Sequence, residues 1–184
     1  MNVPVPIEVS MAAGDTTGVI QRLNVFEAAA GIVPGRITNV IKGGITGSQW
    51  GVALEWEMDG ATAIGGVLNT FVWQIRVLLE GLGPGANEFS LPTAGPHEVK
   101  YAGPALPTVP TFGLPAPLGV QAQLFTTNIS FAPAGVPPVN PATIPAGLYK
   151  LAVVLQLFNN SVANGGTPLA IAGFVDGGLV HFTD

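Results

Sequence analysis

Apolar and polar residues alternate with a period of two along three long segments of the chain, Gln49–Asp59, 69–80 and 147–159. A strand places alternate residues on opposite faces, whereas a helix would scatter these apolar sets around its circumference. The pattern therefore predicts three β-strands. We expect their in-phase apolar residues to form the core: Trp50, Leu54, Trp56, Trp73, Ile75, Val77, Leu151, Val153 and Leu155.

Shorter or weaker alternation predicts six further strands at 19–27, 36–42, 97–101, 120–131, 170–175 and 179–182. The apolar phase of 120–131 shifts near Phe125, which indicates a bend or a β-bulge. Between the last two segments, Asp176-Gly177-Gly178 is typical of a tight hairpin turn. The pattern allows a helical turn only at 24–32.

These elements predict an all-β chain. Eight or nine strands, each with one apolar face to cover, favour a two-sheet antiparallel β-sandwich, immunoglobulin-like or jelly-roll, with long Pro- and Gly-rich loops. The absence of long helical patterns excludes an α/β fold. We expect a single β-sandwich domain over 1–184, with an extended N-terminal arm over about 1–18.

Two segments, 103–117 and 132–145, depart from the strand pattern because each contains five prolines. Proline cannot donate to a β-ladder and favours extended polyproline geometry. We interpret both as surface arms or loops, with rigid connections between the sheets as the alternative. The alternating residues 1–10 are suited to adding a strand to their own sheet or to a neighbour's. These neutral, extended segments are expected to carry much of the contact between subunits.

Charge is scarce: charged residues make up 9% of the chain, against roughly 25% in an ordinary soluble domain. The net charge is −5, and the six basic residues are scattered, so the basic patch that nucleic acid requires is missing. Mean hydropathy is +0.49. The longest apolar stretches, 71–82 and 148–158, contain Arg76 and Lys150 and are too short to span a bilayer, so we expect no integral membrane insertion. Neutral apolar surface on such a chain favours self-association into a homo-oligomer.

The chain contains no cysteine, which excludes disulfides and thiolate metal sites. Residues 1–6 have neither a basic n-region nor an apolar h-region, so they do not form a classical signal peptide. We therefore expect a protein that is cytoplasmic or part of a released assembly.

Few residues suggest chemistry. His97 and His181 are far apart in sequence, and we interpret them as a solvated strand edge and an outward strand residue rather than as members of a triad or metal site. Glu55 and Glu57 share one strand face, a pattern that fits glycoside hydrolysis or, with Asp59, a calcium site. The same pattern is typical of the solvated face of a strand whose other face is core, which is the interpretation we prefer.

The three tryptophans suit either a sugar-stacking platform or the core, and their in-phase positions favour the core. No glycine-rich segment carries the Lys-Ser/Thr of a phosphate loop. We predict no catalytic, cofactor-binding or metal-binding residue and no enzyme activity. We expect a structural subunit that self-assembles into a homo-oligomer, filament, tube or coat through neutral apolar surfaces and extended arms. The alternative is a binding module that recognises a glycan or a protein partner through its loops.

Overall fold

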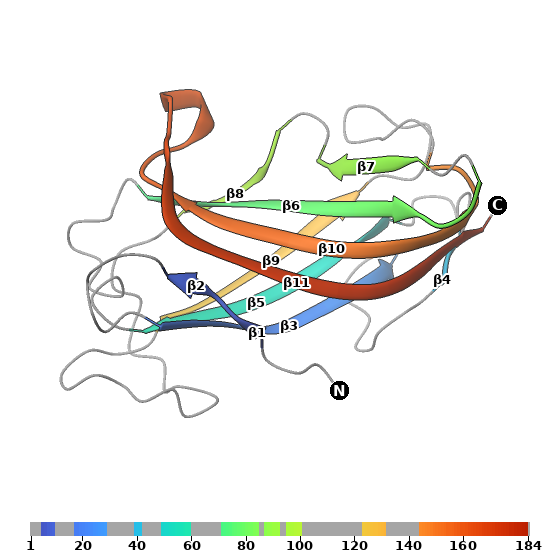
Figure 1. The fold of residues 1–184 in the computed structure, drawn as a ribbon, viewed down its shortest axis with the longest axis horizontal. Coiled ribbons are helices and arrows are strands. Elements are labelled where there is room, and N and C mark those ends of the chain that lie inside the picture. Colours follow the sequence, from blue (N-terminus) through green and yellow to red (C-terminus); the bar gives the residue numbers. More distant parts are fainter. Residues whose placement is uncertain are drawn as a thin grey trace.

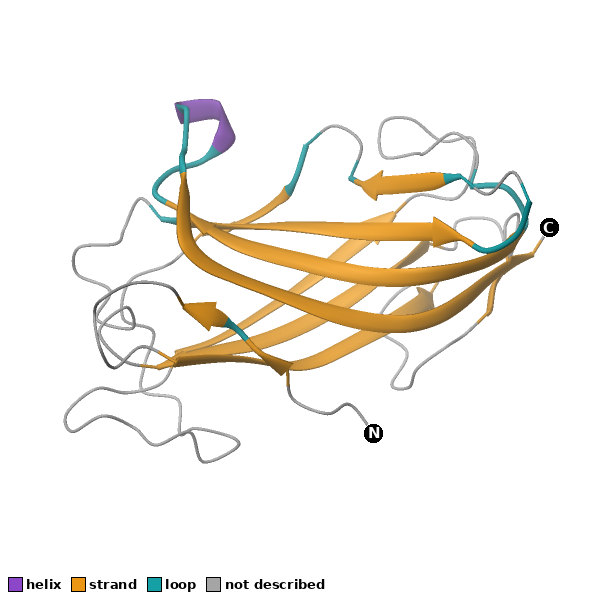
Figure 2. Ribbon diagram, in the orientation of Figure 1, coloured by secondary structure: helices purple, strands orange, loops and turns teal. Residues whose placement is uncertain are grey.

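The computed structural model describes residues 5–9, 17–28, 39–41, 49–59, 71–84, 87–92, 95–100, 123–131 and 144–183. Within them the strands form two sheets that lie one behind the other and pack together (Figure 1). Apart from the 3-10 turn η2 (Val162–Asn164), the described residues contain no helix (Figure 2). The predicted two-sheet antiparallel β-sandwich is confirmed.

Within the described residues, the first sheet has four strands, and all of their pairings are antiparallel. Its long central strand coincides with the predicted segment Gln49–Asp59. In spatial order the strands are β1 (Val5–Pro6), β3 (Thr17–Ala28), β5 (Gln49–Asp59) and β9 (Gln123–Phe131).

The second sheet contains seven described strands, and its long strand β10 (Gly147–Phe158) lies in the middle. On one side β10 pairs with β11 (Pro168–Thr183), which in turn pairs antiparallel with β2 (Glu8–Val9) and parallel with β4 (Asn39–Ile41). On the other side β10 pairs with β6 (Val72–Gly81). The far edge of β6 pairs with two short strands, β7 (Glu88–Leu91) and β8 (His97–Lys100).

The core lies between the sheets and contains all nine residues that the alternation predicts, each buried. Its centre is an aromatic cluster. Trp56 stacks on Phe125 with ring centroids 5.2 Å apart, and Trp73 meets Trp56 edge to face at 5.8 Å. Offset and edge-to-face pairs of this kind each add about 0.5–1.5 kcal/mol beyond the burial of area.

The predicted hairpin at Asp176-Gly177-Gly178 is wrong, because β11 runs through these residues as one continuous strand. Leu151 pairs with Gly178 and Ala152 with Asp176, so Gly177 is an extra residue in the ladder, a β-bulge. The long neighbour β10 pairs with both halves of β11 and holds them in line. A Cβ atom on Gly177 would overlap the end of the Leu151 side chain, so a larger residue here would require that buried leucine to move.

Two smaller predictions also fail. Residues 24–28 of the proposed helical turn belong to β3, where they pair with β5. Of the bend or β-bulge expected near Phe125, the bulge is excluded, since β9 pairs with β5 without a register shift from Gln123 to Phe131. A register shift occurs instead in β3, between Ile20 and Arg22.

The N-terminal arm joins both sheets of its own chain. β1 pairs with β3 of the first sheet, and β2 pairs with β11 of the second. Ile7 lies between them, 5% exposed within the core cluster, and its N–H donates to the Gly18 carbonyl at 2.8 Å. The described part of the arm, residues 5–9, therefore connects the two sheets along one side of the sandwich, and we call it the N-terminal seam. The Pro-rich segments 103–117 and 132–145 lie outside the described residues, except for Ile144 and Pro145.

Candidate functional site

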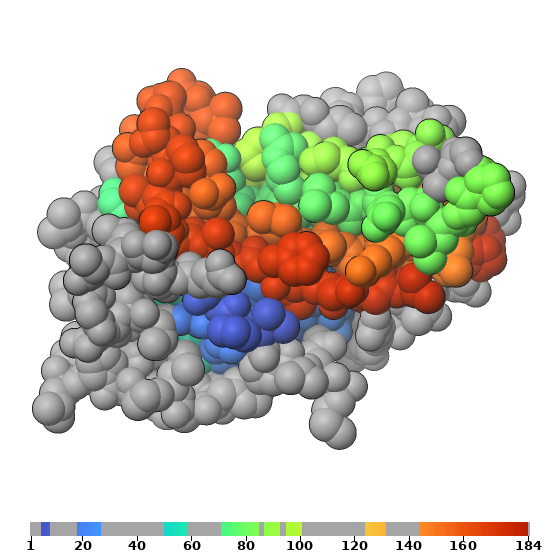
Figure 3. Space-filling model, in the orientation of Figure 1, coloured from blue at the N-terminus to red at the C-terminus, as the bar shows by residue number. Residues whose placement is uncertain are grey.

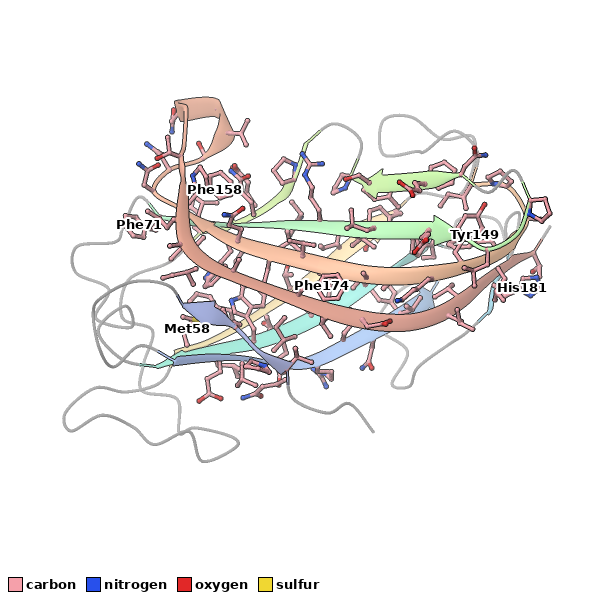
Figure 4. All side chains as sticks on the ribbon, in the orientation of Figure 1. Met58, Phe71, Tyr149, Phe158, Phe174 and His181 are labelled. Atoms are coloured by element: carbon pink, nitrogen blue, oxygen red, sulfur yellow. The ribbon has the colours of Figure 1, made fainter. Side chains whose placement is uncertain are left out.

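The outward face of the second sheet carries large apolar side chains in contact with solvent. Phe174, Leu179 and Leu148 on β11 and β10 are 53%, 47% and 40% exposed. Strand pairing places Val154 beside Phe174 and Ala152 beside Leu78. Figure 3 shows this side of the molecule, and Figure 4 labels Phe174 near its middle. We call the following six residues the apolar outer face: Leu78, Leu148, Ala152, Val154, Phe174 and Leu179.

A groove of about 470 Å³ opens on the apolar outer face, lined by residues of β6, β7, β10 and β11 that include Leu78, Ala152 and Phe174. Charged side chains also line it. Lys150 Nζ lies 3.3 Å from Asp176 Oδ2 at its margin. Glu80 is the cross-strand partner of Lys150 on one side and of Glu88 on the other. The groove thus combines an apolar wall with a lysine and carboxylates.

His97 is half-buried at the start of β8, and its Nε2 lies 2.9 Å from the Thr127 hydroxyl on β9. The contact joins the second sheet to the first. Burial lowers the pKa of His97 below its usual 6.5, because the charged imidazolium is poorly solvated there. The expected solvated edge is therefore wrong for His97, whose side chain serves the packing between the sheets.

Its neighbour Glu98 points to the opposite face of β8 and anchors the turn between β10 and β11. Glu98 Oε1 accepts the backbone N–H of Val162 at 2.7 Å and the side-chain amide of Gln74 at 3.4 Å. Figure 1 shows this turn curling over one end of the second sheet. Glu98 is thus engaged in holding a loop against the sheet.

Glu57 is buried, at 1% exposure, and accepts a hydrogen bond from Gln21 Nε2 on β3. Val19 and Ala53 on the same face are buried too. The expectation of a solvated face is therefore wrong here, because alternation shows which residues share a face but not whether that face is covered. Glu55 is half-buried and pairs with Arg22 at 3.0 Å. The side chain of Asp59 lies outside the described residues.

The structure keeps the predicted candidates apart. His181 lies exposed on the outward face of β11, as predicted, and the glutamates lie on the outward face of the first sheet. All three tryptophans are buried, so they form no sugar platform. Among the described residues, no group of three or more His, Asp or Glu side chains is arranged to hold a metal ion.

Sequence reasoning missed the apolar outer face, although a signal for it was present. Leu148 and Val154 lie on the same strand face as the charged Lys150. Phe174 lies on the strand face opposite to that of its buried neighbour Val175. Apolar residues on the phase opposite to the core are the pattern that indicates a contact surface.

Comparison of the chain with protein-family models, curated proteins and solved structures found no match. The described part of the chain has no helix of the length and apolarity needed to cross a membrane.

Proposed function

We propose that this chain is a non-enzymatic structural subunit that assembles with copies of itself into a homo-oligomer, filament, tube or coat. The observation that carries the proposal is the apolar outer face, where three large apolar side chains of one sheet are 40–53% exposed, Leu148 and Leu179 toward one end and Phe174 beyond Asp176. Clustered apolar surface of this kind marks interaction sites. The low charge of the whole chain, 9% of residues, supports the same conclusion.

Burial of the apolar outer face contributes favourable free energy to association. Fully burying a large apolar side chain is worth about 1.5–3 kcal/mol, so covering a half-exposed one yields roughly 1 kcal/mol. In a two-fold contact both subunits contribute the same surface, so each of these side chains is buried once in each subunit and its contribution counts twice. Phe174, Leu179 and Leu148 together then supply several kcal/mol toward the entropy lost on association.

The alternative is a binding module for a glycan or a protein partner. The groove supports it, since its volume of about 470 Å³ lies within the range of roughly 300–1,000 Å³ that ligand pockets occupy. Self-association explains the low charge of the whole chain as well as the groove, so we place it first.

The test compares two substitutions at similarly exposed apolar positions. Phe174 is 53% exposed on the apolar outer face, and Val162 is 56% exposed in the turn η2. By size-exclusion chromatography with light scattering, Phe174→Asp is expected to raise the concentration for half-maximal assembly at least about fivefold, equivalent to about 1 kcal/mol. Val162→Asp adds the same charge elsewhere and is expected to leave assembly unchanged.

A wild-type protein that stays monomeric at every concentration would refute the proposal. Binding of a glycan or a protein by that monomer would establish the alternative. Equal effects of the two substitutions would show that assembly uses another surface.

A further inference from the structure

In the part of the chain that the structure describes, the first sheet ends in a long strand that has a neighbour on one side only. Among the described strands, β9 pairs with β5 and with no other strand. Its register with β5 is unbroken over nine residues, so no bulge twists its edge away. Along 126–130 no described strand pairs with the backbone N–H and C=O groups on the edge away from β5, and these groups have the spacing that a further strand requires.

The other edge strands of the sandwich are protected in ways that β9 is not. Natural sheets prevent edge-to-edge association with short edge strands, charges, prolines and bulges. β1 and β2 have two residues each, with Pro6 in β1, and β4 has three. β7 and β8 have four residues each, and both carry charged residues.

The sequence of β9, QLFTTNISF, contains neither a charged residue nor a proline. Threonine, isoleucine and phenylalanine, which favour strands, make up most of it. On its outward face Thr126, Asn128 and Ser130 are exposed. Their hydroxyl and amide groups can donate and accept hydrogen bonds across a strand pair.

We propose that residues 126–130 of β9 pair antiparallel with β9 of a second copy around a two-fold axis, continuing the first sheet from one subunit into the next. The inference rests on the proposed function and names the backbone contact through which copies join. A second copy suits this edge because two-fold pairing brings each residue opposite another from the same strand. A charged strand would then face like charges, and β9 has none.

This edge is distinct from the apolar outer face, which belongs to the second sheet. A subunit with two different two-fold contacts joins one neighbour through each. Such contacts generate either a closed group of subunits or an open chain.

Because the chain contains no cysteine, one introduced thiol reports on one contact. The test uses Thr126→Cys, Asn128→Cys and Ser130→Cys in the full chain, each alone and in mixed pairs under mild oxidation. Opposed residues of antiparallel strands have Cα atoms about 4.5–5.5 Å apart, within the range that a disulfide bridges. The matched control is Ala163→Cys, exposed in the turn η2.

We expect one position or one mixed pair to give disulfide-linked dimer as the main product, and the control to give background only. That position or pair also identifies the residues opposed across the two-fold axis. In parallel, Asn128→Lys is expected to weaken assembly several-fold, and Ala163→Lys to have no effect, with both variants unfolding at the wild-type temperature.

The outcomes separate this inference from the proposed function. If the wild type assembles but no β9 cysteine cross-links above the control, and Asn128→Lys assembles normally, the β9 pairing is refuted while self-assembly stands. A monomeric wild type overturns both. If the β9 cysteines cross-link to an added foreign protein and not to a second copy, the edge binds a heterologous strand and the two-fold pairing is wrong.

Discussion

His97 Nε2 on β8 lies 2.9 Å from Thr127 Oγ1 on β9, and this contact bridges the two sheets at one side of the sandwich. Burial lowers the pKa of His97, so the folded protein favours the neutral imidazole. The burial of His97 therefore makes the stability of the sandwich sensitive to pH.

In the unfolded chain the His97 pKa is about 6.5, and in the folded protein it is lower. Between these two values the unfolded state binds more protons, so the free energy of unfolding decreases as pH falls through this window. Above pH 6.5 this contribution to the pH dependence disappears. Urea unfolding is measured at a series of pH values. As the pH falls, the free energy of unfolding is expected to decrease less for His97→Gln than for the wild type.

Thr127→Val serves as the control for the cause of the shift. It removes the hydroxyl but leaves His97 buried, so the acid sensitivity is expected to persist. Identical pH profiles for wild type and His97→Gln would mean that burial does not shift this pKa.

Gly178 has φ of +79°, and its N–H donates to Asp176 Oδ1 at 2.7 Å. A residue with a Cβ atom in this left-handed region is disfavoured by about 1–2 kcal/mol. We expect Gly178→Ala to lower the free energy of unfolding by that amount, measured by urea denaturation. Gly178→Asn should lose less, because asparagine tolerates positive φ. Wild-type stability of the alanine variant would argue against a bulge at this point of β11.

Trp56 is fully buried and stacks on Phe125. Trp56→Ala is expected to lower the free energy of unfolding by about 3–5 kcal/mol, the usual effect of removing a buried aromatic side chain. Trp56→Phe should lower the free energy of unfolding by less than Trp56→Ala does. It keeps a ring beside Phe125 and removes a buried indole N–H that has no hydrogen-bond partner among the described residues. If guanidinium denaturation gave the same midpoint for Trp56→Ala and wild type, the aromatic cluster would not be the centre of the core.

Ile7 is the buried residue of the N-terminal seam. We expect Ile7→Ala to lower the free energy of unfolding by about 2 kcal/mol, the low end of the range for buried isoleucine, because the adjoining strands are short. The exposed neighbour provides the control, and Pro6→Ala should change stability by less than about 1 kcal/mol. Equal thermal unfolding of Ile7→Ala and wild type would show that the arm does not hold the sheets together.

The fold class and the core could be predicted because they depend on local alternation, as the agreement of β5 with its predicted bounds shows. The continuity of β11 could not be predicted in this way. A Gly-Gly pair permits both a hairpin and a bulge, and the choice depends on β10, which pairs with both halves from a distance in sequence. The burial of Glu57 likewise depends on what lies over its face, a property that strand periodicity does not contain.

The central claim, that this chain is a self-assembling subunit, is tested most directly by sedimentation velocity of the full-length protein from micromolar to submillimolar concentrations. We predict species heavier than the 18.8 kDa monomer that grow with concentration. Their proportion should be the same at low and high salt, because apolar contacts and backbone pairing are screened far less than ion pairs. A single monomeric species at every concentration would contradict the account.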